Sequence, residues 1–166
     1  MTLPDELDLL LVEHDPLEAE LLFRALAELT ERERIGVARD GEEALDWLLG
    51  RGAFRHRLGS LLPRLVLLEL RLPRLDAVEI LRTMRASPRT ATVPVVVLSS
   101  SADPREVAQC YLAGANSCIR KPIDFREYAE TIRATGRYWL TLNRPAQGAA
   151  PAGQGSRDTI SAQGPS

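Results

Sequence analysis

Five short apolar runs alternate along the chain with longer segments in which apolar residues recur every three or four positions. Two of the runs, Leu65–Leu68 and Val95–Leu98, are apolar at every position, which is typical of strands buried on both faces of a parallel sheet. We therefore expect five strands, at residues 7–13, 34–40, 65–70, 93–99 and 117–120.

The segments between the runs predict five helices. Three begin with the pattern Asp-x-x-Glu, at residues 15–18, 103–106 and 124–127. In a capping box the Asp binds free N–H groups of the first turn and the Glu reaches back to the cap, so each pattern predicts a helix start. Apolar positions at helical spacing mark two more helices, within residues 44–49 and 78–84, and the last helix should end near residue 140.

This order of elements predicts an α/β fold, a (βα)5 doubly wound, five-stranded parallel sheet with helices on both faces. A chain of 166 residues fits one such domain, which we assign to residues 1–142. Residues 143–166 are rich in Pro, Ala, Gln, Gly and Ser without periodicity, and we expect a disordered tail there.

Composition and short motifs argue against several classes of function. The 23 acidic and 21 basic residues nearly balance and form no basic stripe, which argues against nucleic acid as a partner. The first residues do not resemble a signal peptide and no apolar run approaches the roughly 20 residues that span a bilayer, so we expect a cytoplasmic protein without membrane contact. Cys110 and Cys118 lack CxxC spacing and are expected to be reduced packing residues. No motif of the common enzyme classes occurs, so we do not expect an enzyme.

Polar residues gather where the predicted strands end. Glu13 and Glu69 lie at the ends of the first and third strands, while Ser99 ends the fourth and Lys121 follows the fifth. Because open parallel sheets bind ligands beyond these strand ends, the four residues predict one site. Lys121 is also the single lysine among 21 basic residues, which indicates a role for a compact ammonium that a planar guanidinium does not fill.

Five segments carry a resemblance to a known family. They are LLLVEHDP, VARDGEEAL, PRLVLLELRLPRLDAVEIL, VPVVVLSSSAD and AGANSCIRKPIDF, and they resemble in order the signatures of response-regulator receiver domains over residues 7–140. The resemblance implies the CheY-like, flavodoxin-like receiver fold and a role in two-component phosphorelay signal transduction. The ending, with Asp124-Phe125 and Tyr138-Trp139-Leu140, is similar to single-domain regulators associated with phytochrome-type histidine kinases, so such a kinase is an expected partner.

The resemblance also implies a role for each site residue. In the family, an acid pair after strand one and an Asp ending strand three hold Mg²⁺, and that Asp accepts a phosphoryl group from a phosphohistidine. A Ser or Thr and a Lys bind the phosphoryl oxygens. An aromatic residue three positions before the Lys rotates on phosphorylation and so transmits the change to the protein surface. In this chain the acid pair becomes Glu13 and His14 and the phosphoacceptor position is Glu69. The phosphoryl-binding and switch positions are Ser99, Cys118 and Lys121.

Three of these positions depart from the family pattern. Neutral imidazole is a poor Mg²⁺ ligand, so His14 should weaken metal binding. Glu69 carries one methylene more than Asp, and a displacement of about 1 Å can cost roughly 10²-fold in an aligned reaction. Cys118 removes the aromatic switch. We therefore expect no cofactor and signalling by protein contact without phosphorylation; the alternative is a regulator that still accepts a phosphoryl group from a histidine kinase with Mg²⁺.

Three interpretations of the altered pocket stay open. In the first, Glu69 imitates an acyl phosphate, pairs with Lys121 and locks one conformation. In the second, the pocket has decayed and Lys121 is a remnant beside Pro122, where a cis peptide shapes the loop. In the third, Glu13, His14 and Glu69 bind a softer metal such as Mn²⁺, Fe²⁺ or Zn²⁺.

A signal must leave a single-domain receiver through its surface. Aromatic residues are 5% of the chain, and several gather in the last two helices, which favours a contact with a second copy or a kinase. We expect a homodimer through the face formed by helix four, strand five and helix five; the alternative is that some of these rings only cover the core. The candidate interface residues are Tyr111, Phe125, Tyr128, Tyr138 and Trp139.

Overall fold

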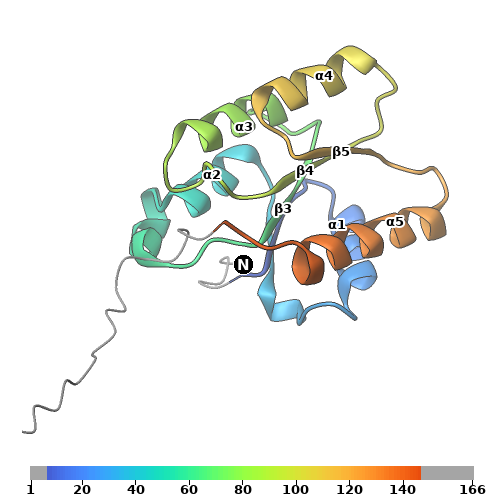
Figure 1. The fold of residues 1–166 in the computed structure, drawn as a ribbon, viewed down its shortest axis with the longest axis horizontal. Coiled ribbons are helices and arrows are strands. Elements are labelled where there is room, and N and C mark those ends of the chain that lie inside the picture. Colours follow the sequence, from blue (N-terminus) through green and yellow to red (C-terminus); the bar gives the residue numbers. More distant parts are fainter. Residues whose placement is uncertain (1–6, 147–166) are drawn as a thin grey trace, which may run out of the picture.

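One parallel five-stranded sheet forms the centre of the molecule (Figure 1). The computed structural model describes residues 7–146. Its strands lie in the order β2-β1-β3-β4-β5, which confirms the predicted fold class. Each strand lies within its predicted range, and β5 matches it fully. The strands are β1 (Leu9–Val12), β2 (Ile35–Ala38), β3 (Leu65–Glu69), β4 (Val95–Ser99) and β5 (Ser117–Arg120).

Five helices cover the two faces of the sheet. α1 (Pro16–Leu26) and α5 (Phe125–Arg137) lie on one face, and α2 (Gly41–Leu49), α3 (Ala77–Ala86) and α4 (Pro104–Ala113) lie on the other (Figure 1). A π-helical turn over Tyr138–Leu142 prolongs α5, so the last helical segment ends close to the predicted residue 140.

Alternation along the strands sends side chains into two separate cores. In β3, Leu65 and Leu67 pack beneath α1 and α5, whereas Val66 and Leu68 pack beneath α2, α3 and α4. All four are at most 1% exposed, and burying each apolar side chain contributes about 1.5–3 kcal/mol to the folded state. The sheet is therefore fixed on both sides, and its strand ends are held in register at one edge.

The helix starts differ from prediction in one respect. Asp15, Asp103 and Asp124 cap α1, α4 and α5 through their carboxylates, as predicted, but the glutamates three residues on do not reach back. A complete capping box occurs instead at α3, between Asp76 and Glu79. At α1 and α4 the Glu is used elsewhere, because Glu18 binds Lys121 and Glu106 binds Arg71.

A segment between α2 and β3 was not predicted. It contains 3-10 turns over Gly52–Gly59 and is fastened by buried Arg57, whose guanidinium lies 3.3 Å from the centroid of the Trp47 ring. Arg89 donates hydrogen bonds to four backbone carbonyls around it. Forked guanidinium donors suit such carbonyl clusters, which accounts for arginine rather than lysine at these positions.

Three further expectations concern membrane-spanning helices, the peptide bond before Pro122 and the C-terminal tail. Among residues 7–146 no helix is long and apolar enough to cross a membrane. The peptide bonds of the same residues include no cis bond, so the cis bond that the decayed-pocket interpretation placed before Pro122 does not occur. The predicted tail beyond residue 146 lies outside the described residues.

Candidate functional site

The structure brings the predicted strand-end residues together at the C-terminal edge of the sheet. Glu13 follows β1, Glu69 ends β3, and both are nearly inaccessible, at 3% and 4% exposed. Ser99 ends β4 and is 5% exposed. Lys121 follows β5, and its backbone N–H donates to the Ser99 carbonyl at 2.8 Å.

The Lys121 ammonium is the centre of an ion-pair cluster. It pairs with Oε2 of Glu69, binds Oε2 of Glu18 at 2.5 Å and lies 3.8 Å from Oε2 of Glu13. The lysine side chain is only 11% exposed. Burial lowers the pKa of Lys121, but the hydrogen bonds that the ammonium donates to Glu18 and Glu69 outweigh burial and raise the pKa overall, so the amine stays charged at neutral pH.

Glu18 is the site residue that the sequence analysis missed. It lies in the first turn of α1 and was interpreted as half of a capping box. The available signal was its position, because the first turn of a helix that directly follows β1 stands at the same edge of the sheet as Glu13. Its carboxylate points to β5 instead of to its own helix end.

Glu13 is buried with only part of its hydrogen-bonding capacity used. Oε1 accepts from the backbone N–H of Asp15 at 2.9 Å, whereas Oε2 has no hydrogen-bond partner among the described residues. Burial raises the pKa of the Glu13 carboxyl to about 7, because the Asp15 N–H and Lys121 do not fully offset it and the charges of Glu69 and Glu18 add to it.

Tyr128 of α5 borders the same cluster. Its hydroxyl is buried without a partner among the described residues. Burial raises the pKa of this phenol, and the negative charges of Glu18, Glu69 and Glu13 raise it further. A neutral phenol of α5 is thus within electrostatic range of the acidic cluster.

Glu69 connects the cluster to α4. Its Oε1 accepts from the backbone N–H of Arg71 at 3.2 Å. The guanidinium of Arg71 in turn forms an ion pair with Glu106, in the first turn of α4. The position of the Glu69 carboxylate is therefore linked through one loop to the helix on the candidate signalling face.

His14 does not join the cluster. Its side chain is 52% exposed, and its Nδ1 lies 3.4 Å from Oε1 of Glu13. Among the described residues, the group of three side chains placed to hold one ion is Glu13, Glu18 and Glu69, with ligand atoms within 4.8 Å of one another. The predicted soft-metal set is thus wrong in one member, since Glu18 stands where His14 was expected.

These residues do not fit the Mg²⁺ site that the resemblance implied. The second acid of the pair is replaced by an exposed imidazole, and the Lys121 ammonium already contacts the oxygens that a metal would need. Octahedral Mg²⁺ requires oxygens at about 2.0–2.1 Å in fixed directions, and an ammonium among them blocks that geometry.

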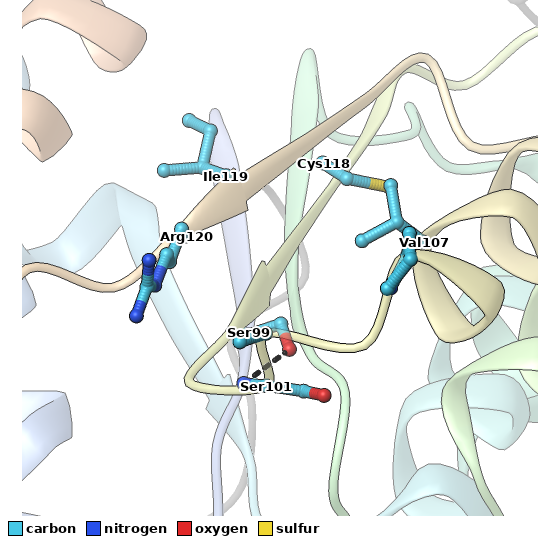
Figure 2. Close-up of a pocket in the computed structure, with 8 residues that line it drawn as sticks. Ser99, Ser101, Val107, Cys118, Ile119 and Arg120 are labelled. Carbon is cyan, nitrogen blue, oxygen red and sulfur yellow. Dashed lines mark hydrogen bonds between the residues drawn. The ribbon is translucent and has the colours of Figure 1, made fainter.

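A surface cavity of about 350 Å³ opens beside β5 and the start of α4 (Figure 2). Ser99 Oγ accepts from the backbone N–H of Ser101 at 3.0 Å at its floor, and Cys118 and Val107 line one wall. An aromatic side chain in place of Cys118 would fill part of this space.

Cys110 and Cys118 are both free and pack in the core, as predicted. Burial raises the pKa of the Cys118 thiol to about 11.

The candidate interface residues differ in their exposure to solvent. Phe125 (74%), Tyr138 (50%) and Tyr111 (48%) are exposed. Trp139 is half-buried and meets Tyr138 edge to face, with centroids 5.0 Å apart. Tyr128 is 4% exposed and belongs to the core, so its assignment to an interface is wrong: it lies four residues before Ile132 on the buried stripe of α5.

Comparisons with known proteins agree with this fold. The chain is 39% identical over 141 residues to the probable methanogenesis regulatory protein FilR2 of Methanothrix harundinacea, covering 84% of this chain and 88% of FilR2. It is 29% identical to response regulator Rcp1 of Synechocystis sp., covering 83% of this chain and 92% of Rcp1. The crystal structure of Mn²⁺-bound Rcp1 gives a TM-score of 0.75 at 27% identity, covering 83% of this chain and 97% of that structure. The crystal structure of the phosphorylated cyanobacterial phytochrome response regulator RcpA gives a TM-score of 0.77 at 28% identity, covering 84% and 98%.

The family model for the response regulator receiver domain matches residues 9–133, which include every strand and the four clustered side chains. The phytochrome response regulators are close structural neighbours. From this match, the sheet order and the site at the strand ends, the chain belongs to the response regulator receiver family of two-component signal transduction.

Proposed function

We propose that this receiver signals through protein contacts without accepting a phosphoryl group. The observation that carries the proposal is the Lys121 ammonium, which is bound between Glu69 and Glu18 and lies 3.8 Å from Glu13. A lysine so engaged has its donors committed before any phosphoryl group arrives.

Phosphoryl transfer needs a free nucleophile and a cation that neutralises the developing charge. Here the Glu69 oxygen that would attack is ion-paired, and its carboxylate is one methylene longer than that of Asp. The residues at the metal position do not fit Mg²⁺. Each change acts on the same transition state, so their effects on the rate combine.

The contacts support the locked pocket over a decayed one. Removing one partner of a buried ion pair lowers stability by about 3–5 kcal/mol. A pocket that has lost its function is therefore expected to lose both charges or neither. In this pocket the acids and the lysine remain in contact, and Glu18 adds a further partner from α1. The locked pocket would hold Arg71 and Glu106, and with them α4, in one arrangement.

The proposed partners are a histidine kinase, with a phytochrome-type kinase as the specific candidate, and a second copy of the chain. The phytochrome-type partner is suggested by the relatives Rcp1 and RcpA. The exposed rings of Tyr111, Phe125 and Tyr138 support contact through α4, β5 and α5. The chain would then act as a binding module and not as an enzyme.

The test is incubation with Mg²⁺ and a small phosphodonor such as acetyl phosphate, followed by intact mass measurement. We expect no phosphoryl adduct on the wild-type chain. Glu69→Asp serves as the matched control, because it restores the shorter carboxylate in the same fold. A stoichiometric wild-type adduct that disappears in Glu69→Gln would overturn the proposal.

A second function has one observation in its favour. The relative RcpA has been crystallised in phosphorylated form, so a regulator of this fold accepts a phosphoryl group. Under this alternative Glu69, or another side chain, accepts the group with Mg²⁺ and Lys121 turns from Glu69 to the phosphoryl oxygens. The same mass experiment separates the two functions.

A further inference from the structure

We propose that the Lys121 ammonium is an internal cation, occupying a three-carboxylate site in place of a divalent metal, and that Glu18 is the third carboxylate of that site. The inference rests on the proposed phosphorylation-independent function and explains how the acidic edge stays folded without an ion. It concerns binding at the site and adds no chemical step.

The possible ligands of an ion and the ion-pair partners of Lys121 are the same three residues. Among residues 7–146, one group of three side chains is arranged to ligate an ion, and it consists of Glu13, Glu18 and Glu69. The carboxylates around the Lys121 ammonium are the same three. The lysine therefore sits at the position where an ion bound by this group would sit.

Two buried carboxylate oxygens of the site lack hydrogen bonds to the described residues. Oε2 of Glu13 and Oε2 of Glu69 are buried without hydrogen bonds in standard geometry, and both oxygens face Lys121. Buried carboxylate oxygens are costly unless a positive charge or a donor satisfies them. The ammonium supplies this charge, and no other Lys or Arg ion pair joins these two carboxylates in the described part of the chain.

The four charged side chains of the site come from four different elements of the fold. The carboxylates come from the end of β1, the first turn of α1 and the end of β3, and the cation comes from the end of β5. A cation attached to the chain is present at an effective concentration in the millimolar range or above, so a free ion must displace it to bind. The internal cation also ties three strands and α1 together without a ligand.

The residue type fits this role. An ammonium is a compact point charge with three donors and can stand among three carboxylates, whereas a guanidinium fork pairs in one plane. Every other basic residue in the 166-residue chain is arginine. The single lysine therefore occurs where a spherical cation is needed.

Metal binding to variants tests the inference. Lys121→Met removes the charge and keeps the length of the side chain, so the three carboxylates become free for an ion. We expect Mn²⁺ to bind this variant at least about tenfold more tightly than it binds the wild type, measured by calorimetric titration, which corresponds to about 1.4 kcal/mol.

Two double variants identify the ligands. Lys121→Met with Glu18→Gln should lose the gain in Mn²⁺ affinity, because one carboxylate is missing. Lys121→Met with Glu20→Gln should keep the gain, since Glu20 lies in the same helix but pairs with Arg24 and Arg32. Equal Mn²⁺ affinities of wild type and Lys121→Met, or an unchanged gain after Glu18→Gln, would overturn the inference.

A measurement on the intact lysine covers a failure of Lys121→Met to fold. Because the chain has one lysine, labelling lysine with ¹³C at Cε gives one side-chain NMR signal. We expect Glu18→Gln to lower the pKa reported by this signal and Glu20→Gln to leave it unchanged; equal values in the two variants would contradict the role of Glu18. Neither readout depends on a phosphodonor, so failure here is distinguishable from failure of the proposed function.

Discussion

Glu13 is the residue whose charge depends most on its neighbours. Its side chain is 2% exposed, one oxygen lacks a hydrogen bond, and burial raises its pKa to about 7 from an ordinary value of 4.5. Lys121 lies 3.8 Å away and is bound more closely by Glu69 and Glu18. One ammonium among three acids leaves Glu13 the least compensated, and a proton on Glu13 relieves the excess charge.

This arrangement predicts a stability difference that depends on pH. A carboxyl whose folded pKa is raised stabilises the fold below its unfolded pKa, and that contribution is lost as pH rises through the folded value. Ionising Glu13 should therefore cost the wild type up to about 3 kcal/mol between pH 5 and pH 8. Glu13→Gln stays neutral, and its amide oxygen can still accept from Asp15.

Urea unfolding at pH 5 and pH 8 measures the effect. Glu13→Gln should lose less stability than wild type over this interval and be the more stable protein at pH 8. The two proteins differ only at residue 13, so the difference between the two profiles measures the effect of the Glu13 carboxyl. Parallel profiles would show that the Glu13 carboxyl is ionised throughout.

Sequence reasoning at the residue scale found most of the site. Glu13, Glu69 and Lys121 could be predicted because parallel strands place their ends at one edge. Glu18 could not, because a capping box already accounted for it and the choice between two partners depends on where β5 ends. The separation of His14 from the cluster could have been predicted, since adjacent residues leaving a strand point to different sides.

At the scale of elements, helix and strand identity follow from periodicity, while contacts between elements do not. The apolar runs predicted all five strands, because both faces of a parallel sheet must be buried. The 3-10 turns at Gly52–Gly59 were missed because they have no periodic apolar face. They are held by the guanidinium groups of Arg57, within the turns, and of Arg89, between α3 and β4. Tyr128 was misplaced because its position on α5 was judged without the helical phase.

The contact between α1 and α5 depends on a glycine. Gly136 is buried in α5, and a Cβ added there would lie 2.5 Å from Cδ2 of Leu26 and 3.0 Å from Cδ1 of Leu29. Alanine would gain up to about 1 kcal/mol in helix propensity. Overpacking of a closed contact costs about 1–3 kcal/mol, so the second effect wins.

We therefore expect Gly136→Ala to lower the free energy of unfolding by about 1 kcal/mol, measured by chemical denaturation. Gly59→Ala is the matched control, because a Cβ there has no atom within 4 Å, and its stability should change by less than about 0.5 kcal/mol. A Gly136→Ala protein as stable as wild type would mean that α1 and α5 can move apart without loss.

On the scale of the whole molecule, the pocket and the candidate interface are joined by few contacts. Glu69 accepts from Arg71, Arg71 pairs with Glu106, and Glu106 lies in the first turn of α4. The exposed apolar side chains Tyr111 and Leu112 lie on the same helix, and Tyr138 and Leu142 lie beyond α5. A change in the pocket can therefore reach the surface through α4.

We expect a homodimer through this face, with light scattering at micromolar concentration giving twice the 18.3 kDa of one chain. Burying exposed apolar side chains drives such contacts, so Tyr138→Ser and Leu142→Ser should weaken the dimer by at least about tenfold each. Leu61→Ser, at an exposed leucine outside α4, β5 and α5, should leave it unchanged. A monomer at these concentrations would contradict the proposed interface.

The same dimer reports whether the pocket is locked or decayed. If Lys121 and Glu69 hold α4 in its dimerising arrangement, Glu69→Ala and Lys121→Arg release Arg71 and Glu106 and should shift the dimer dissociation constant in the same direction as each other. The size of this shift is limited by how much more tightly the chain dimerises with α4 held by the pocket than with α4 released. Glu20→Gln, on α1 and outside the cluster, should cause no shift. Dissociation constants that are equal in all four proteins would mean that α4 does not respond to the pocket, and the decayed pocket would then be the better account.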